Sequence, residues 1–386
     1  MNKTPDIHPD DIMSGNVTYK ESHSIDTYFQ EFVDDSTIVC IYSGPNSGPN
    51  GRSIHNVPVE ILRNYILKII KPGMKIFFDD SYEGIFFHTL IDKIHCIIKD
   101  TEIDPSQIYY FSAAVNSVEL YKNFCQIKNI TKPINVYSYN LWEYLNYRAF
   151  GDIRDRFNVI KKKEKLFLCF NRRFRLHRYA LIGLLLEKDL VKNSYYSFFL
   201  DNYKKTNIID ELRYYNVSEK VSGIIYNEIQ KNEHLFPIRL NIDPDNNKVH
   251  LDNDDMRFFD NSYFSLVTET GFFNDVIFFS EKIYKPITVR HPFILVSTPH
   301  SLKYLRGLGY KTFSPFINES YDDIENHEAR LIAIVDEIER LNKFTNDEWI
   351  KWQHDVEHIV DHNHMIIRTR KINEYAISRP NYRTQP

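Results

Sequence analysis

Four arginines lie within eight residues in the second half of the chain, in the segment Asn171–Arg178 (NRRFRLHR). The segment follows the apolar run LFLCF and precedes a run of helical period, so it is predicted to form the turn between a strand and a helix. Basic side chains at a helix start are opposed by the helix dipole, and their accumulation there indicates a bound anion such as a diphosphate. A solvated, charged linker with surface arginines would give the same pattern.

A second stretch places an acid and a base side by side at a predicted helix start. The strand-like run YFSLVTE ends at Glu269, and Ser280 can cap a helix that opens with Glu281 and Lys282. The carboxylate of such a pair can accept hydrogen bonds from two ribose hydroxyls, and the ammonium can hold phosphate together with the helix N–H groups. The alternative is that Ser280 and Glu281 are simply a cap and a first-turn acid.

Carboxylates also follow a predicted strand of the first half. The run MKIFFDD ends with Asp79 and leads into Glu83 and Gly84. Side chains at this edge of an α/β sheet face the ligand-binding crevice, so Glu83, and next Asp79, are candidates for a general base. Gly84 would allow a substrate to approach closely. Alternatively, Asp80 or Ser81 caps the following helix, with Glu83 as the acid of a capping box.

Two further groups resemble metal ligands only in part. The segment 243–255 has paired acids but lacks the Gly and Glu that a calcium loop requires. His354, His358 and His362 are spaced at one helix face without the H-E-x-x-H pattern, and neighbouring tryptophans indicate a packed or solvated helix. We therefore expect no metal site.

The elements that must position these residues alternate between strands and helices, which is typical of an α/β fold with parallel sheets. The first half contains apolar runs at 37–43, 74–80, 107–113 and 134–140, and the second half at 166–170, 195–200, 263–269, 292–297 and 310–316. The charged stretch 151–165 is predicted to be a linker. We expect an acceptor-binding α/β domain over 1–155, a nucleotide-sugar-binding α/β domain over 156–345, and a C-terminal helical segment over 346–386 that packs on the first domain.

Composition and charge restrict the class of protein. The net charge of −4 provides no overall basic surface for nucleic acid or anionic lipid. The four cysteines include no C-x-x-C pair, and three lie in apolar runs, which indicates free thiols in a reducing compartment. No apolar stretch approaches the roughly 20 residues of a membrane span. We expect a cytoplasmic protein, or one in the host cytoplasm if it is viral.

The segment from Leu166 to Asp322 resembles a known family. Its arginine-rich turn is followed by YFSLVTET, SEKIYKP, the run PFIL and the helical LKYLRGLG. This order is similar to the donor-binding half of glycosyltransferases of the GT-B architecture, closest to the fucosyltransferase-like group. The most specific part is Glu281-Lys282 following Glu269. The first half matches the family only in its α/β rhythm.

The resemblance implies two Rossmann-like domains, with C-terminal helices crossing back to the first. It also implies transfer of a sugar from a nucleoside-diphosphate sugar to an acceptor hydroxyl by direct displacement, without a metal or other cofactor. Arg178, with Arg175 beside it, would bind the diphosphate, Glu281 the ribose and Lys282 the phosphates. Glu269 and Lys285 complete the donor-binding candidates, although Lys285-Pro286 departs from the usual fucosyltransferase pattern.

The acceptor and the donor sugar stay open. The acceptor could be a glycan or another hydroxyl compound. A second possibility is a hydroxymethylated base in phage or viral DNA, because the basic run 161–178 could hold phosphates. A third is a non-catalytic protein that binds a nucleotide-sugar or a glycan. The net charge of −4 favours the first over a DNA acceptor.

Overall fold

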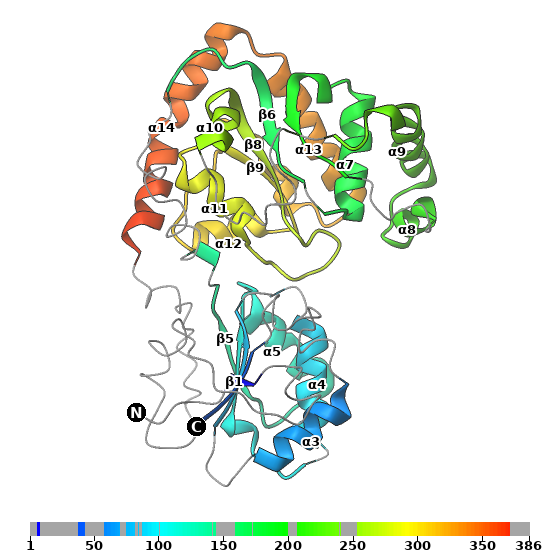
Figure 1. Cartoon of the computed structure of the whole chain (residues 1–386), viewed down its shortest axis with the longest axis vertical. Helices are drawn as coiled ribbons and strands as arrows, with labels where there is room; N and C mark the ends of the chain where they lie inside the picture. Colours follow the sequence, from blue (N-terminus) through cyan, green and yellow to red (C-terminus); the bar gives the residue numbers. More distant parts are fainter. Residues whose placement is uncertain are drawn as a thin grey trace. The chain divides into compact units, whose positions relative to one another are not determined.

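A computed structural model gives the fold of both halves of the chain (Figure 1). It describes residues 6–7, 38–42, 58–69, 75–81, 84, 87–99, 101–140, 142–143, 159–171, 173–199, 207–238, 240 and 253–370. The acidic segment at 243–252 and most of the expected linker, residues 151–158, lie outside this part of the chain.

The chain divides into two compact units. The first contains Met1–Leu141, Val276–Phe278 and Lys371–Pro386, and the second contains Trp142–Asp275 and Phe279–Arg370. The division after Leu141 comes earlier than the limit at residue 155 that the sequence suggested. The helix that begins at Asn346 belongs to the second unit. The expected packing of 346–386 on the first domain therefore stays a prediction for the residues after Arg370.

The described strands of the first unit form one parallel sheet in the order β1-β2-β3-β4-β5. Each new strand is added at the same edge, so right-handed crossovers place α3, α4 and α5 on one face of this sheet (Figure 1). The elements are β1 (Asp6–Ile7), β2 (Ile38–Tyr42), α3 (Val59–Ile69), β3 (Lys75–Asp80), α4 (Phe87–Lys99), β4 (Ile108–Ser112), α5 (Ser117–Lys128) and β5 (Asn135–Ser138).

The two faces of this sheet are both apolar, as expected for parallel strands. Ile76, Phe78 and Tyr110 belong to the core that the sheet shares with α3 and α4, and all three are buried. On the alternate face, the rings of Phe77 and Tyr109 stack with their centroids 4.7 Å apart. The runs of aromatic residues that predicted these strands therefore supply both faces.

A short segment of the second half of the sequence completes the first unit. Val276 lies in the first core, and Ile277 is held by two hydrogen bonds. The N–H of Val115 donates to the carbonyl of Ile277 at 2.9 Å, and the N–H of Ile277 donates to Oδ1 of Asn116 at 2.9 Å. The sequence did not indicate that this segment belongs to the first unit, because its placement depends on contacts between residues about 160 positions apart.

The described strands of the second unit form a parallel sheet in the order β7-β6-β8-β9. The chain first adds β7 to one side of β6 and later adds β8 to the other, so the strand order reverses between β6 and β8. The elements are β6 (Lys165–Cys169), α7 (Leu176–Glu187), β7 (Ser194–Tyr196), α8 (Ile208–Tyr214), α9 (Glu219–Lys231), α10 (Asn253–Asp260), β8 (Ser262–Thr268), α11 (Glu281–Thr288), β9 (Phe293–Val296), α12 (Ser301–Gly307), α13 (His327–Asn342) and α14 (Asn346–Thr369).

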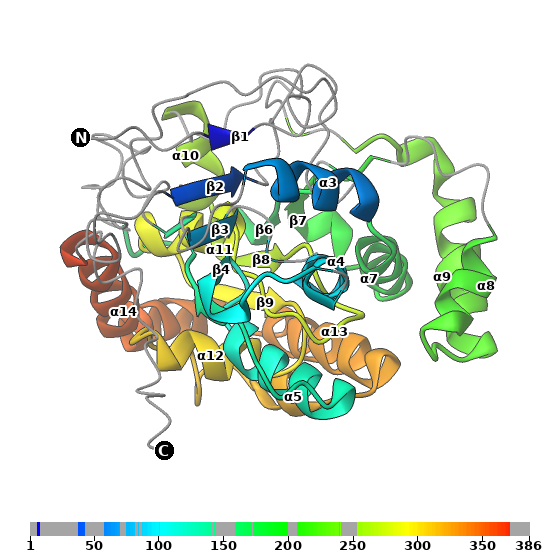
Figure 2. The ribbon, with the colours of Figure 1, turned by 90° about the horizontal axis from the view of Figure 1, so that it is seen from below.

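Helices cover both faces of the second sheet (Figures 1 and 2). The reversal of strand order sends α7 and α11 to opposite faces, because both crossovers are right-handed. α7 packs against α13 and α9 on one face, and α11 packs against α14 on the other. Gly183 of α7 permits the close contact with α9, since a Cβ there would lie 2.8 Å from Cγ2 of Ile225.

The expected α/β class with two parallel sheets is confirmed, and most predicted strands lie within one or two residues of their expected ends. One strand prediction is wrong, because residues 310–316 form a loop and a turn. The backbone of this loop bonds to α14 instead, where Asn363 pairs with the N–H and carbonyl of Lys311 at 2.7 and 2.9 Å. The helices α8, α9 and α10 were not predicted.

Candidate functional site

The candidate site lies at the carboxyl ends of β6 and β8. These strands are neighbours, with Phe167 paired to Phe264 and Leu168 to Ser265. In open α/β sheets, ligands bind outside the carboxyl ends of the strands at the point where the strand order reverses. The two segments that the sequence singled out, after β6 and after β8, both begin at this point.

Asn171 joins the strand ends beneath the site. Its side chain is buried, and its Nδ2 donates to the hydroxyl of Tyr196 at 3.1 Å and to Sγ of Cys169 at 3.2 Å. Its Oδ1 accepts from the hydroxyl of Thr268. The turn after β6 is therefore bonded to the ends of β7 and β8, which fixes where α7 begins.

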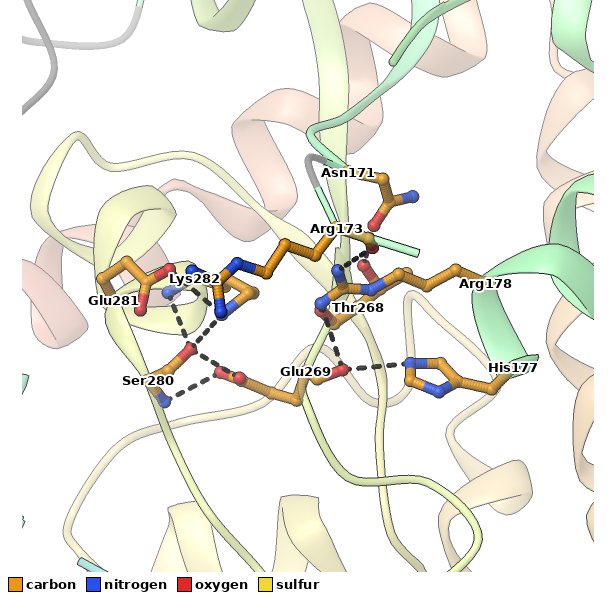
Figure 3. Close-up of polar contacts among 9 residues, drawn as sticks. All are labelled: Asn171, Arg173, His177, Arg178, Thr268, Glu269, Ser280, Glu281 and Lys282. Atoms are coloured by element: carbon orange, nitrogen blue, oxygen red, sulfur yellow. Dashed lines mark hydrogen bonds and ion pairs between the residues drawn. The ribbon is translucent and has the colours of Figure 1, made fainter. Parts of the chain in front are cut away.

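Arg178, in the first turn of α7, is buried, and its side chain donates hydrogen bonds to backbone carbonyls (Figure 3). Its guanidinium donates to the carbonyls of Arg173 and Thr268, each at 2.9 Å, and at 3.4 Å to that of Glu269. Burial, and next the charge of Arg175, lowers the pKa of this group. The side chain is 3% exposed, so Arg178 is not a surface arginine. Its Nε alone has no hydrogen-bond partner among the described residues.

His177 lies beside Arg178 and binds the same strand end. Its Nε2 donates to the carbonyl of Glu269 at 3.0 Å, and its ring stacks on Phe272 with centroids 5.5 Å apart. Burial, together with the charge of Arg178, lowers the pKa of His177 well below its ordinary value, so the ring is neutral. Two successive residues of α7 thus hold the end of β8.

Glu269 is fully buried, and both its carboxylate oxygens are occupied. Oε1 accepts from the N–H of Ser280 at 3.0 Å, and Oε2 accepts from the hydroxyl of Ser280 at 2.6 Å. Burial raises the pKa of Glu269. The carboxylate is therefore bonded to the first residues of α11 from the protein interior and is not exposed to a ligand.

Ser280 caps α11 as predicted, and it also binds Lys282. Oγ of Ser280 accepts from the N–H of Lys282 at 3.3 Å and from its Nζ at 2.9 Å. Nζ also lies 3.0 Å from Oε1 of Glu281. The side chains of Glu281 and Lys282 remain 23% and 24% exposed, so a ligand can reach both.

Glu281 is held in its charged form. Burial alone would raise its pKa, but the charges of Lys282 and Lys285 outweigh that effect and lower the pKa to about 2. Lys285 is half-buried and lies one helical turn after Glu281. An ionised carboxylate is a hydrogen-bond acceptor only, which suits binding to a pair of hydroxyls.

Among the described residues of the arginine-rich turn, the exposed cations are Arg173 and Arg175. In Figure 3 the side chain of Arg173 points toward Glu281 and Lys282. Arg175 is the N-cap residue of α7, with an extended backbone and no side-chain hydrogen bond to the helix start. The sequence alone did not single out Arg173. Its position was the available signal, because Arg173 follows β6, next to the point where the strand order reverses.

The basic run 161–178 does not form one surface. Lys163 donates to the carbonyl of Val159 at 3.0 Å and Lys165 to that of Lys192 at 2.8 Å, both at the amino end of β6. The arginines lie at its carboxyl end, about 16 Å away at roughly 3.3 Å per residue. The basic side chains of this run are therefore divided between the two ends of β6, and the structure adds no support for a DNA acceptor.

The proposed base candidates fall mostly outside the described residues. Glu83 does so entirely, and Asp79 is described only as a backbone position of β3, paired with Phe111. The neighbouring Asp80 is fully buried and accepts from the hydroxyl of Tyr110 at 2.8 Å. α4 begins at Phe87, so neither Asp80 nor Ser81 is its N-cap residue.

Gly84 has a different role from the expected one. A Cβ at this position would lie 2.3 Å from the backbone nitrogen of Ala114 and 2.7 Å from the carbonyl carbon of Ala113. The close approach that Gly84 permits is therefore to the backbone after β4. The expectation that it admits a substrate was wrong for this reason.

The histidines of α14 are either exposed or bonded to backbone carbonyls of neighbouring segments. His354 and His358 are exposed, whereas Nε2 of His362 donates to the carbonyl of Gly309 at 2.9 Å. His364 is buried with Nδ1 2.8 Å from the carbonyl of Thr288. Within the described residues, no group of three histidine, cysteine or acidic side chains could hold a metal ion. None of the described helices is long and apolar enough to cross a membrane.

Comparison with known proteins gives weak similarities only. No protein-family model matches the chain, and no curated protein matches it. Among solved structures, an α,α-trehalose-phosphate synthase (UDP-forming) from Burkholderia vietnamiensis is 12% identical, with 94% of this chain and 86% of that chain covered and a TM-score of 0.42. A solved structure from E. coli, named as trehalose-6-phosphate bound with UDP-2-fluoro glucose, is 12% identical. The match covers 91% of this chain and 73% of that chain, with a TM-score of 0.43.

The Candida albicans trehalose-6-phosphate phosphatase N-terminal domain is 9% identical, with 95% of this chain and 76% of that chain covered and a TM-score of 0.40. Similarity at this level does not establish a shared activity. The chemistry of the site therefore has to follow from its own geometry.

Proposed function

We propose that the chain is a glycosyltransferase that moves a sugar from a nucleoside-diphosphate sugar to an acceptor hydroxyl. The second unit binds the donor, and the first binds the acceptor, a glycan or another hydroxyl compound. Displacement is direct and uses no bound metal or other cofactor. The free thiols of Cys96, Cys125 and Cys169 suit a reducing compartment such as the cytoplasm.

One observation carries the proposal. Two turns that are about 100 residues apart in sequence meet where the strand order of the second sheet reverses, and each presents a reachable cation there. Lys282 lies at the start of α11, and Arg173 points toward it from the turn before α7 (Figure 3). The helix starts contribute further N–H donors, so a diphosphate is the ligand that this arrangement favours.

The proposed roles of the individual residues follow from their exposure. Lys282, Arg173 and Arg175 contact the phosphates, because their side chains are reachable. Glu281 accepts hydrogen bonds from the ribose hydroxyls as an ionised carboxylate, and Lys285 maintains that charge. Arg178 holds the turn in place through its hydrogen bonds to the carbonyls of Arg173 and Thr268.

This arrangement would stabilise the leaving group. When the bond between the sugar and the diphosphate breaks, negative charge develops on the departing phosphate oxygen. Cations fixed beside that oxygen before the reaction stabilise the transition state more than the ground state. The acceptor hydroxyl must lose a proton as it attacks, and Glu83 or Asp79 remains the proposed base.

The test is release of nucleoside diphosphate from a panel of nucleotide-sugars, with and without acceptors, in buffer containing EDTA. We expect release from one class of donor, little change on adding EDTA, and a loss of about tenfold or more in Lys282→Ala, in line with removal of a charged hydrogen-bonding group. Binding of a nucleoside diphosphate without release or transfer would indicate a non-catalytic binding protein. No binding of any nucleoside diphosphate would contradict the proposal.

A further inference from the structure

We propose that Glu269 is a positioning residue that fixes the ammonium of Lys282 for phosphate binding, acting through the hydroxyl of Ser280. This inference rests on the proposed function, because it assigns to Lys282 the phosphate contact described above. It gives Glu269 a role that differs from direct donor binding, which its complete burial does not permit.

A continuous chain of hydrogen bonds joins the three residues (Figure 3). Nζ of Lys282 lies 2.9 Å from Oγ of Ser280, and the Ser280 hydroxyl lies 2.6 Å from Oε2 of Glu269. Oε1 of Glu269 also accepts the N–H of Ser280 at 3.0 Å, so the serine is held at two atoms. The side chain of Lys282 is thus connected to a carboxylate that lies beneath α11.

The directions of these bonds are fixed by the available hydrogens. An ammonium only donates and an ionised carboxylate only accepts, so the single Ser280 hydrogen points to Glu269 and the Oγ lone pairs face Lys282. A hydroxyl that donates to a charged acceptor is itself a better acceptor. Without Glu269, the Ser280 hydroxyl would be free to rotate, and Lys282 would lose a fixed partner.

The backbone of Glu269 links this chain to the other turn. Its carbonyl accepts from Nε2 of His177 at 3.0 Å, and from the guanidinium of Arg178 at 3.4 Å. The main chain of one residue is therefore bonded to α7, and its side chain to the start of α11. Glu269 can set the position of Lys282 relative to the turn that carries Arg173.

The charge of Glu269 should govern how strongly Lys282 is held. The charge of Lys282 favours the ionised form of this carboxyl and that of Glu281 opposes it, and Arg178 also attracts it electrostatically. On the side of α7, Arg178 approaches its main chain, whereas His177 is neutral. Burial raises the pKa of Glu269, so the carboxyl takes up its proton at a higher pH than an exposed glutamate.

The experiment measures the dissociation constant of UDP, GDP, ADP or CDP, whichever binds most tightly, by titration calorimetry. We expect Glu269→Gln and Ser280→Ala each to bind about tenfold more weakly than wild type, as for the loss of a charge-assisted hydrogen bond. Ser280→Thr keeps the hydroxyl and should bind within about threefold of wild type. Lys188→Ala, which removes an exposed cation at the far end of α7, is the matched control.

The pH dependence separates positioning from a merely structural role. The ratio of the Glu269→Gln and wild-type dissociation constants should be largest at pH 8 and fall toward one as the pH drops through the pKa of Glu269, because both side chains are then neutral. A ratio that does not change with pH would overturn the inference. Wild-type affinity in Ser280→Ala would do the same, and this variant answers the question even if Glu269→Gln does not fold.

The failure of this inference can be distinguished from that of the proposed function. If Lys282→Ala weakens binding while Glu269→Gln and Ser280→Ala do not, the donor site stands and Glu269 has no positioning role. If Lys282→Ala itself binds as tightly as wild type, the proposed phosphate contact is wrong and this inference is overturned with it.

Discussion

The guanidinium of Arg178 donates a hydrogen bond to the backbone carbonyl of Thr268 at 2.9 Å, which joins the first turn of α7 to the last residue of β8. The same group donates to the carbonyl of Arg173 at 2.9 Å, within the turn that connects β6 to α7. One buried cation therefore holds both sides of the site. Its hydrogen bonds fix the two turns, whereas Arg173 is exposed, as the proposed phosphate contact requires.

Replacement of Arg178 should therefore affect stability as well as binding. In Arg178→Ala the carbonyls of Thr268 and Arg173 lose a buried donor, and we expect the free energy of unfolding to fall by about 3 kcal/mol. The midpoint of urea unfolding measures this. Arg173→Ala serves as the control and should change stability by less than about 0.5 kcal/mol. Equal stability of the two variants would contradict the structural role of Arg178.

Arg173 should matter for binding instead. Arg173→Ala is expected to weaken nucleoside diphosphate binding about tenfold, because it removes a charged contact to phosphate. Titration calorimetry measures this change, and Lys188→Ala provides the comparison, since it removes an equal charge at the opposite end of α7. Similar affinities for the two variants would show that Arg173 does not contact the ligand.

Gly84 should tolerate no side chain. A Cβ would lie 2.3 Å from the backbone nitrogen of Ala114, and neither backbone can move away without disturbing β4. We expect Gly84→Ala to lower the free energy of unfolding by about 3 kcal/mol, at the upper end for overpacking. Gly223→Ala in α9 is the control, because a Cβ there meets nothing within 4 Å, and it should stabilise by about 0.5–1 kcal/mol. A small effect in Gly84→Ala would contradict the close backbone contact.

Glu143 should make stability depend on pH. It is buried at the start of the second unit, where its carboxylate bonds to Arg370 at 2.5 Å and to the hydroxyl of Tyr310. Burial raises its pKa to about 7, although Arg370 and Tyr310 act in the opposite direction. The folded state therefore binds more protons than the unfolded state between pH 4.5 and 7, and this contribution to stability falls as the pH rises through that window.

Glu143→Gln removes this titration. The stability of wild type relative to the variant should fall by about 3 kcal/mol between pH 4 and pH 8, the amount that the shift in pKa corresponds to. Urea unfolding of both proteins across this range measures it. A difference that stays constant, or that grows toward pH 8, would contradict the raised pKa.

The strands could be predicted because their residues are buried on both faces. The run at 262–268 is buried throughout, and such runs are recognisable from apolar and aromatic composition alone. Residues 310–316 have a similar composition but form a loop that is bonded to α14, which only tertiary contacts determine. The helices α8 and α9 went unrecognised because Tyr214 and other exposed aromatic residues obscure their helical period.

The candidate site was predictable in its location but not in its detail. The sequence identified both turns, because charged residues directly after apolar runs indicate the carboxyl edge of a sheet. It could not predict that Arg178 is buried and Arg173 exposed. The burial of Arg178 depends on its hydrogen bond to the carbonyl of Thr268, about 90 residues away. The burial of Glu269 was unpredictable for the same reason, because its partner Ser280 occupies both oxygens.

The central claim is that Arg173 and Lys282 bind one pyrophosphate. It is tested most directly by titrating UDP, GDP, ADP and CDP into wild type, Arg173→Ala, Lys282→Ala and the double variant. We predict that one nucleotide binds wild type, that each single variant binds it about tenfold more weakly, and that the losses are not additive because both cations contact the same ligand. Wild-type affinity in Lys282→Ala, or no binding of any nucleoside diphosphate to wild type, would contradict the account.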